Sequence, residues 1–137
     1  MNTSELIALE EGLKLMPQFH KRDGLLPVAV QETSTGQILM IASINEEALK
    51  ITLDTKLTTF WSTSRNQLWT KGETSGDTLK IDNILIDCDQ DALVYQVTLM
   101  GQGVCHTYNS EDMHRKACFY RELDIKENKL SFIKGMQ

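Results

Sequence analysis

Residues 79–99 read LKIDNILIDCDQDALVYQVTL, and two β-prone runs within them, 79–87 and 92–99, flank the polar group Asp89-Gln90-Asp91. Apolar runs on both sides of a short polar group are typical of a β-hairpin, so this stretch predicts two antiparallel strands. Similar runs predict further strands at 25–32, 37–44, 58–63, 67–71, 116–124 and 129–133. No helices of crossover length alternate with these runs, which disfavours a parallel, doubly wound sheet. We therefore expect a β-rich α+β fold built on an antiparallel sheet.

Two helices are expected outside the strands. Apolar residues recur at spacings of three and four over 4–16, which predicts an amphipathic helix within the first 20 residues, with a role in packing or dimerisation. Asn45 precedes Glu46 and Glu47. An asparagine cap and acidic residues in the first turn both favour a helix start, so a second, short helix is expected near 45–55.

The composition is that of one globular domain. The chain has 137 residues, of which 41% are hydrophobic and 24% charged, and its formal net charge is −5. This balance disfavours a strongly basic nucleic-acid binder, and no apolar run approaches the roughly 20 residues of a membrane span. Acidic residues near the N-terminus argue against a signal peptide, so we expect a cytoplasmic protein. Its three cysteines, an odd number, are then expected as free thiols or metal ligands.

The turn of the predicted hairpin is a candidate metal site. Asp87 and Asp89 share one face of an extended chain, and Asp91 joins them if the chain turns there. Crowded carboxylates repel unless a cation lies among them, and hard oxygen ligands suit Mg²⁺. The thiolate of Cys88, on the opposite face, suits Zn²⁺. The alternative is a polar hairpin tip with a half-buried cysteine.

A second cluster consists of Cys105-His106-Thr107 and Cys118. With Cys88 these cysteines make three soft ligands, an arrangement that leaves a fourth zinc position for water. Zinc lowers the pKa of such a water to about 7, and His106 is near enough in sequence to accept or shuttle the proton. The alternative is a closed structural site, in which His106 or His114 is the fourth ligand.

A third cluster, residues 64–76, combines groups that recognise a phosphorylated ligand with an aromatic base. Arg65 and Lys71 are cations, and Trp69 offers a stacking face. Thr74 and Ser75 offer hydroxyl groups, and the glycines at 72 and 76 let backbone N–H groups approach an anion closely. The alternative is an ordinary polar loop between strands.

Taken in order, these clusters resemble the phosphoribosyl-AMP cyclohydrolase family. The resemblance runs from Gly24 to Tyr120 and rests on an ordered set of segments: GLLP at 24–27, Met40, NEEA at 45–48, LWTKGETSG at 68–76, DCDQD at 87–91, CHT at 105–107 and CFY at 118–120. Each segment alone is unspecific, whereas the combination in this order is highly specific.

The resemblance implies zinc-dependent hydrolysis of the N1–C6 bond of the adenine ring of phosphoribosyl-AMP, the third step of histidine biosynthesis. It implies a two-sheet or pseudobarrel core and an intertwined homodimer. We expect a single domain over 1–137, because the residues after Tyr120 are too few to hold the pyrophosphohydrolase domain often fused to this family. The ligands that the resemblance implies are Cys105, Cys118 and the partner subunit's Cys88 for zinc, and Asp87, Asp89 and Asp91 for magnesium. His106 is implied as the catalytic proton carrier. The implied substrate contacts are Arg65, Trp69, Lys71, Glu73, Thr74 and Ser75.

The chain departs from the family pattern at two places. Thr63 stands where the family usually has a second arginine, and twelve residues separate Cys105 from Cys118, more than the family's usual spacing. The added residues, 108–114, are candidates for a lid, a substrate contact or, through His114, a fourth zinc ligand. These departures leave two alternatives open: a divergent paralogue that hydrolyses another purine-like nucleotide, and a non-catalytic protein that binds zinc or a nucleotide.

Overall fold

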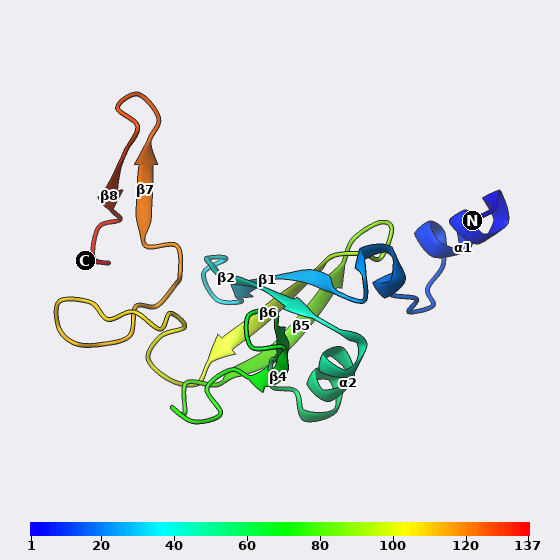
Figure 1. Cartoon of the computed structure of the whole chain (residues 1–137), viewed down its shortest axis with the longest axis horizontal. Coiled ribbons are helices and arrows are strands. Elements are labelled where there is room, and N and C mark those ends of the chain that lie inside the picture. Colours follow the sequence, from blue (N-terminus) through cyan, green and yellow to red (C-terminus); the bar gives the residue numbers. More distant parts are fainter.

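A computed structural model describes residues 1–137 and shows two sheets (Figure 1). The larger sheet has six strands in the order β4-β3-β2-β1-β6-β5, curled into a half-barrel, and the smaller one pairs β7 with β8. The elements in chain order are α1 (Thr3–Glu11), the 3-10 helix η1 (Phe19–Arg22), β1 (Leu26–Glu32), β2 (Ile38–Ile44), α2 (Glu46–Thr55), β3 (Thr59–Ser62), β4 (Gln67–Thr70), β5 (Leu79–Ile86), β6 (Leu93–Leu99), β7 (Arg121–Asp124) and β8 (Lys129–Phe132). The structure is thus α+β, as expected.

The hairpin of residues 79–99 lies at one edge of the large sheet. Strands β5 and β6 pair antiparallel, with Ile86 opposite Leu93 on either side of the turn. The expectation of a wholly antiparallel sheet is wrong at one place, because β6 pairs parallel with β1, with Val28 opposite Leu93. The chain returns to β1 only after β2, α2 and β3–β5, so this pairing joins two halves that are distant in sequence.

Side chains that alternate between buried and more exposed positions along the central strands build the core. Leu26, Val28 and Val30 of β1 are fully buried, and the residues between them are not. Tyr95 and Phe60 add aromatic rings 6.2 Å apart in the middle of this core. Each fully buried side chain of this size contributes roughly 1.5–3 kcal/mol to folding. Helix α2 covers the core, and the Asn45 side chain caps its start by accepting a hydrogen bond of 2.8 Å from the Ala48 N–H.

Two elements are shorter than the sequence predicts. Helix α1 ends at Glu11 rather than near 16, because Gly12 is extended and its N–H bonds back to the Ala8 carbonyl. Strand β7 begins at Arg121 rather than near 116. The residues before it pair irregularly: the Lys116 carbonyl accepts from Val104, and the Cys118 N–H donates to Leu39 over 2.7 Å.

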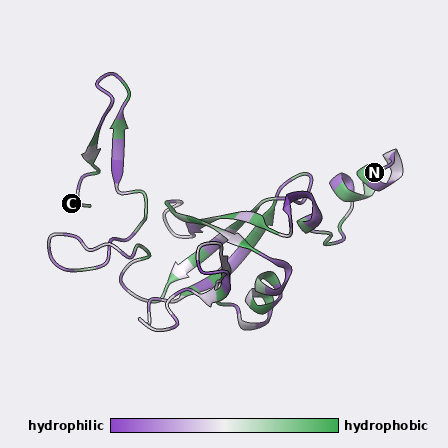
Figure 2. Cartoon of the chain, viewed as in Figure 1, coloured by the Kyte–Doolittle hydropathy of each residue, from purple (hydrophilic) through white to green (hydrophobic).

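The two ends of the chain stand away from the large sheet. Helix α1 lies at one end of the long axis and the β7–β8 hairpin at the other (Figure 1). The hairpin carries both apolar and polar residues (Figure 2), and every residue of its two strands is exposed. No helix combines the length and the apolar character that crossing a membrane requires.

Candidate active site

An open cavity of about 680 Å³ lies along β4 and the loop that follows it. Its lining contains all the residues that the sequence assigns to substrate binding and proton transfer: Arg65, Trp69, Lys71, Glu73, Thr74, Ser75 and His106. Six of them come from one stretch of chain, whereas His106 arrives from the segment after β6. The third sequence cluster and the histidine of the second cluster thus meet at one surface.

The loop of this cavity is held in shape by the strand before it and by a glycine. Trp69 of β4 lies opposite Phe60 of β3, with the two rings 5.0 Å apart. Gly72 has a left-handed φ of 78°, and a Cβ there would overlap the backbone of Asp77. Since only glycine fits this position, the turn that places Lys71 and Ser75 at the cavity depends on it.

Cys105 and Cys118 form a thiol pair, close enough for each to shift the pKa of the other, and Cys105 directly precedes the cavity residue His106. The chain brings them together because the Cys105 N–H donates to the Arg115 carbonyl and the Cys118 N–H to the Leu39 carbonyl. The Thr107 hydroxyl lies 3.0 Å from the Cys105 sulfur. Two adjacent sulfur atoms are soft donors of the kind that binds zinc, so Cys105 and Cys118 fit this metal as part of its ligand set.

The two thiols differ in acidity. Burial disfavours the thiolate of Cys105, but hydrogen bonds from Thr107 and Cys118 and the charge of Arg115 outweigh it and hold the pKa of Cys105 below its usual value. Burial and the neighbouring Cys105 raise the pKa of Cys118 to about 11, against the opposing charge of Lys71. Cys105 therefore loses its proton before Cys118, and both thiols must be deprotonated to bind a metal cation.

Cys88 lies far from this pair within the chain. It is exposed in the β5–β6 turn, before the first residue of β6, whereas Cys105 follows the last residue of that strand. Strand β6 has seven residues, a length of about 20 Å. The three predicted zinc ligands are therefore not brought together in one chain.

The inserted residues 108–114 form a closed loop beside the thiol pair. An isolated bridge joins Tyr108 to His114, and their rings stack with centroids 4.4 Å apart. The His114 Nδ1 lies 2.9 Å from the Cys105 carbonyl oxygen. One ring nitrogen of His114 thus contacts the backbone. The Cys105 carbonyl, and not a sulfur atom, orients the ring. His106 is exposed and lines the cavity.

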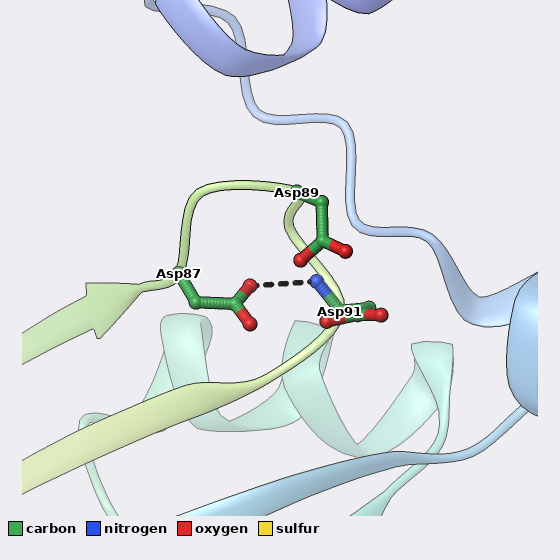
Figure 3. Close-up of side chains that lie close together, drawn as sticks. All are labelled: Asp87, Asp89 and Asp91. Carbon is green, nitrogen blue, oxygen red and sulfur yellow. Dashed lines mark hydrogen bonds between the residues drawn. The ribbon is translucent and has the colours of Figure 1, made fainter.

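The three aspartates of the β5–β6 turn converge as the sequence predicts (Figure 3). One oxygen from each of Asp87, Asp89 and Asp91 lies within 4.8 Å of the others. Asp87 accepts hydrogen bonds from the N–H groups of Asp91 (2.9 Å) and Ala92 (3.2 Å), which fixes the turn. Hard oxygen donors at this spacing fit a magnesium ion that keeps several waters.

Two cations from η1 partly offset the charge of this triad. The Lys21 ammonium lies 3.0 Å from both Asp89 and Asp91, and Arg22 lies 3.3 Å from Asp91. The hydrogen bond from Lys21 lowers the pKa of Asp91 to about 2 despite its burial, with smaller contributions from Asp89 and Asp87. No local pattern predicts this contact, because Lys21 and Asp89 are 68 residues apart.

Gln90 is a second residue whose role the sequence does not reveal. It is buried at the hairpin tip with a left-handed φ of 55°. Its side chain accepts from the Met16 N–H over 2.7 Å and donates to the carbonyls of Leu9 and Lys14, each over 3.2 Å. The only local signal is a polar residue in a turn, which does not say what it contacts.

A cationic cavity with an indole face, next to a thiol pair in a β-rich α+β fold, is typical of enzymes that act on nucleotides with a bound metal. Comparison with known proteins gives the particular family. The model of the phosphoribosyl-AMP cyclohydrolase family matches residues 40–120. Phosphoribosyl-AMP cyclohydrolases of Brucella anthropi and Hyphomonas neptunium are each 44% identical to the chain, over 91% and 85% of it and 84% and 83% of their own lengths. The enzyme of Brucella canis is 44% identical over 88% of this chain and 82% of its own. The chain belongs to the phosphoribosyl-AMP cyclohydrolase family, hydrolases of a cyclic amidine in histidine biosynthesis.

Proposed function

We propose that this protein opens the adenine ring of phosphoribosyl-AMP by hydrolysing its N1–C6 bond, the third step of histidine biosynthesis. One observation carries the proposal: His106 lines the cavity and directly follows Cys105 in the chain, so the cavity adjoins the thiol pair. A nucleotide bound by its phosphate and base in this cavity would place its ring beside the metal ligands. The family membership and the 44% identity to named cyclohydrolases support the same reaction.

Different cavity residues would contact different parts of the substrate. Arg65 and Lys71 would bind phosphate, for which guanidinium and ammonium groups are the usual partners. Trp69 would contact the base, while Thr74 and Ser75 donate hydroxyl hydrogen bonds to ribose or phosphate. Glu73 lines the same wall and is suited to accept from ribose hydroxyls. Only Arg65 of the two family arginines is present, so Lys71 carries more of the phosphate binding.

We assign zinc to Cys105, Cys118 and the partner subunit's Cys88. Zinc, when bound, supplies a water that ionises near neutral pH. His106 is exposed at the cavity, next in sequence to Cys105, so its imidazole can accept a proton from the attacking water and return it to N1 as the C6–N1 bond breaks. The stacking of His114 on Tyr108 and its contact with the Cys105 carbonyl favour a site that stays open to water.

The separation of the thiols supports a homodimer. Cys88 cannot reach the other two cysteines along a seven-residue strand, whereas a second subunit can present its own. The exposed β7–β8 hairpin supports this assembly, because an isolated two-stranded hairpin is marginally stable in water. Leu123, Leu130 and Phe132 of this hairpin are each about half exposed, at 54%, 54% and 49%. We propose that they pack against the partner.

The remaining assignments concern the second metal and the compartment. We propose that the aspartate triad binds magnesium, supported by the convergence of its oxygens. Three free cysteines fit the cytoplasm, where thiols stay reduced.

The decisive experiment is turnover of phosphoribosyl-AMP by the purified protein, with and without a zinc chelator. We expect activity that the chelator removes and added zinc restores. His106→Asn should retain bound zinc and lower kcat by about 100-fold or more, whereas His20→Asn, an exposed histidine of η1, should leave kcat unchanged. A folded, zinc-loaded dimer with no turnover of phosphoribosyl-AMP but turnover of another purine nucleotide would contradict the proposal.

A further inference from the structure

The Lys21 ammonium occupies the place where the aspartate triad would bind a cation. It lies 3.0 Å from Asp89 Oδ2 and 3.0 Å from Asp91 Oδ2, so it bridges two of the three carboxylates. A magnesium ion draws its oxygen ligands to about 2.1 Å and leaves no room for an ammonium group between them. Lys21 and a divalent ion therefore exclude one another at this position.

We infer that Lys21 is a built-in competitor for the triad, holding the carboxylates together without metal and leaving when a divalent cation binds. The inference rests on the magnesium assignment proposed above. Without Lys21, the triad would keep only Arg22, at 3.3 Å from Asp91, against three negative charges. The lysine thus stabilises the metal-free turn and weakens its affinity for divalent cations.

The structure also offers the displaced side chain a destination. A cavity of about 430 Å³ adjoins the turn, and Lys21, Asp89 and Gln18 all line it. Gln18 is only 7% exposed, and its Oε1 has no hydrogen-bond partner. A buried carbonyl oxygen without a partner is costly, and an ammonium group turning away from the triad would satisfy it. Lys21 then has two positions, one on the carboxylates and one beside Gln18.

The test is titration of Mg²⁺ into the zinc-loaded protein by calorimetry, comparing wild type with Lys21→Met. Thiolate sites do not retain Mg²⁺, so the heat reports the triad. We expect Lys21→Met to lower the Kd for Mg²⁺ by about five- to tenfold. Lys50→Met, which removes an exposed lysine of α2 with no carboxylate contact, should leave the Kd unchanged.

Thermal unfolding without Mg²⁺ separates this effect from simple damage. Lys21→Met should have a lower Tm than wild type in metal-free buffer, and the difference should shrink at saturating Mg²⁺. A merely structural lysine predicts loss of both stability and affinity. Lys21→Arg keeps the charge and should retain the weaker, wild-type affinity, so it remains informative if the methionine variant folds poorly.

Two results would overturn the inference, and they differ. If Asp89→Asn abolishes Mg²⁺ binding but Lys21→Met does not tighten it, Lys21 is no competitor while the magnesium assignment stands. If neither wild type nor Lys21→Met binds Mg²⁺, the magnesium assignment fails and the inference fails with it. Turnover of phosphoribosyl-AMP, measured on the same samples, reports the proposed reaction independently.

Discussion

Thr107 is the residue that defines the surroundings of the Cys105 sulfur. Its hydroxyl lies 3.0 Å from that sulfur, and its N–H donates to the same atom over 3.5 Å. Partners of this kind orient a metal ligand, and their removal costs about 10–100-fold in metal affinity. The threonine thereby links the backbone of the CHT segment to the proposed zinc site.

We expect Thr107→Val to weaken zinc binding by about tenfold, because valine keeps the shape and removes the hydroxyl. Competition against a chromophoric chelator measures the affinity directly. Thr107→Ser retains the hydroxyl and serves as the matched control, with affinity close to wild type. Equal zinc affinity in the valine variant would show that the backbone N–H alone supports Cys105.

Asp82 makes stability depend on pH at a site outside the cavity. It lies where the register of β5 shifts between Ile81 and Asn83, and it accepts hydrogen bonds from Thr33 (2.6 Å) and Thr98 (2.7 Å). The bond from Thr33 and then the bond from Thr98 lower the pKa of Asp82 against the effect of burial. Because the folded pKa lies below the unfolded value, the stabilisation is present at neutral pH and is lost as pH falls through the folded pKa.

Asp82→Asn should therefore unfold at lower urea concentration than wild type at pH 7, and the two midpoints should converge as pH falls below about 4. Urea titrations at several pH values measure the difference. Asp54→Asn removes an exposed carboxylate of α2 that has no such threonine bonds. The difference between its urea midpoint and that of wild type should therefore not change with pH. A difference in urea midpoint between wild type and Asp82→Asn that is undiminished at pH 3 would contradict a role for the Asp82 charge.

Among the elements, the N-terminal arm depends on a single side chain of the hairpin tip. The Gln90 side chain makes three hydrogen bonds to residues 9–16. The Gln90 backbone carbonyl accepts a fourth from the Gln18 N–H over 2.8 Å. Helix α1 has only Leu9 buried and contributes little packing of its own. The arm is thus held by polar contacts more than by apolar ones.

Gln90→Asn should release this arm while leaving the sheet intact. Asparagine tolerates the left-handed backbone at this position, but its side chain is one methylene shorter and cannot make all three bonds. We expect trypsin to cleave after Lys14 several-fold faster than in wild type, with a small change in Tm. Gln96→Asn, which shortens an amide that pairs with Gln31 instead, is the control and should leave that cleavage rate unchanged.

The strands and α2 could be predicted from sequence because their signals are local. Alternating apolar residues, the Asn45 cap and the polar turn at 89–91 each act within a few residues, and the observed elements lie within about two residues of most predictions. The parallel pairing of β1 with β6 could not be predicted in the same way. It depends on which strand edges meet after the chain has curled, and no local pattern carries that information.

The same distinction between local and distant contacts applies to the candidate site. The aspartate triad is local in sequence, so its convergence followed from strand geometry. The contact of Lys21 with Asp89 and the bonds of Gln90 join segments roughly 70–80 residues apart and are products of tertiary packing. The position of His106 in the cavity wall likewise required the structure, because β5 and β6 lie between the histidine and the other lining residues.

For the whole molecule, the separation of Cys88 from the thiol pair makes the proposed dimer testable without a structure. If each zinc site takes Cys88 from the partner, Cys88→Ser and Cys105→Ser should both be inactive alone. A hybrid of the two would have one intact site and one site lacking both residues. With random exchange of subunits, about a quarter of the wild-type activity should return.

The experiment mixes the two purified variants under conditions that exchange subunits and then measures turnover of phosphoribosyl-AMP. Cys105→Ser mixed with Cys118→Ser is the matched control. These two cysteines belong to the same chain's pair, so their hybrid has no intact site and should stay inactive. Exchange without recovery in the first mixture would argue against a shared site.

The parallel pairing of β1 with β6 also governs how a growing polypeptide can assemble on the ribosome. Strands β1–β4 and α2 emerge first and pair with near neighbours, but one edge of β1 has no partner until residues 93–99 have been synthesised. During that interval the nascent chain presents an open strand edge, the feature that recruits other chains and chaperones. Cys105 and Cys118 emerge later still. A ribosome that stalls before β6 would therefore release a product with an unfinished sheet and without Cys105 and Cys118.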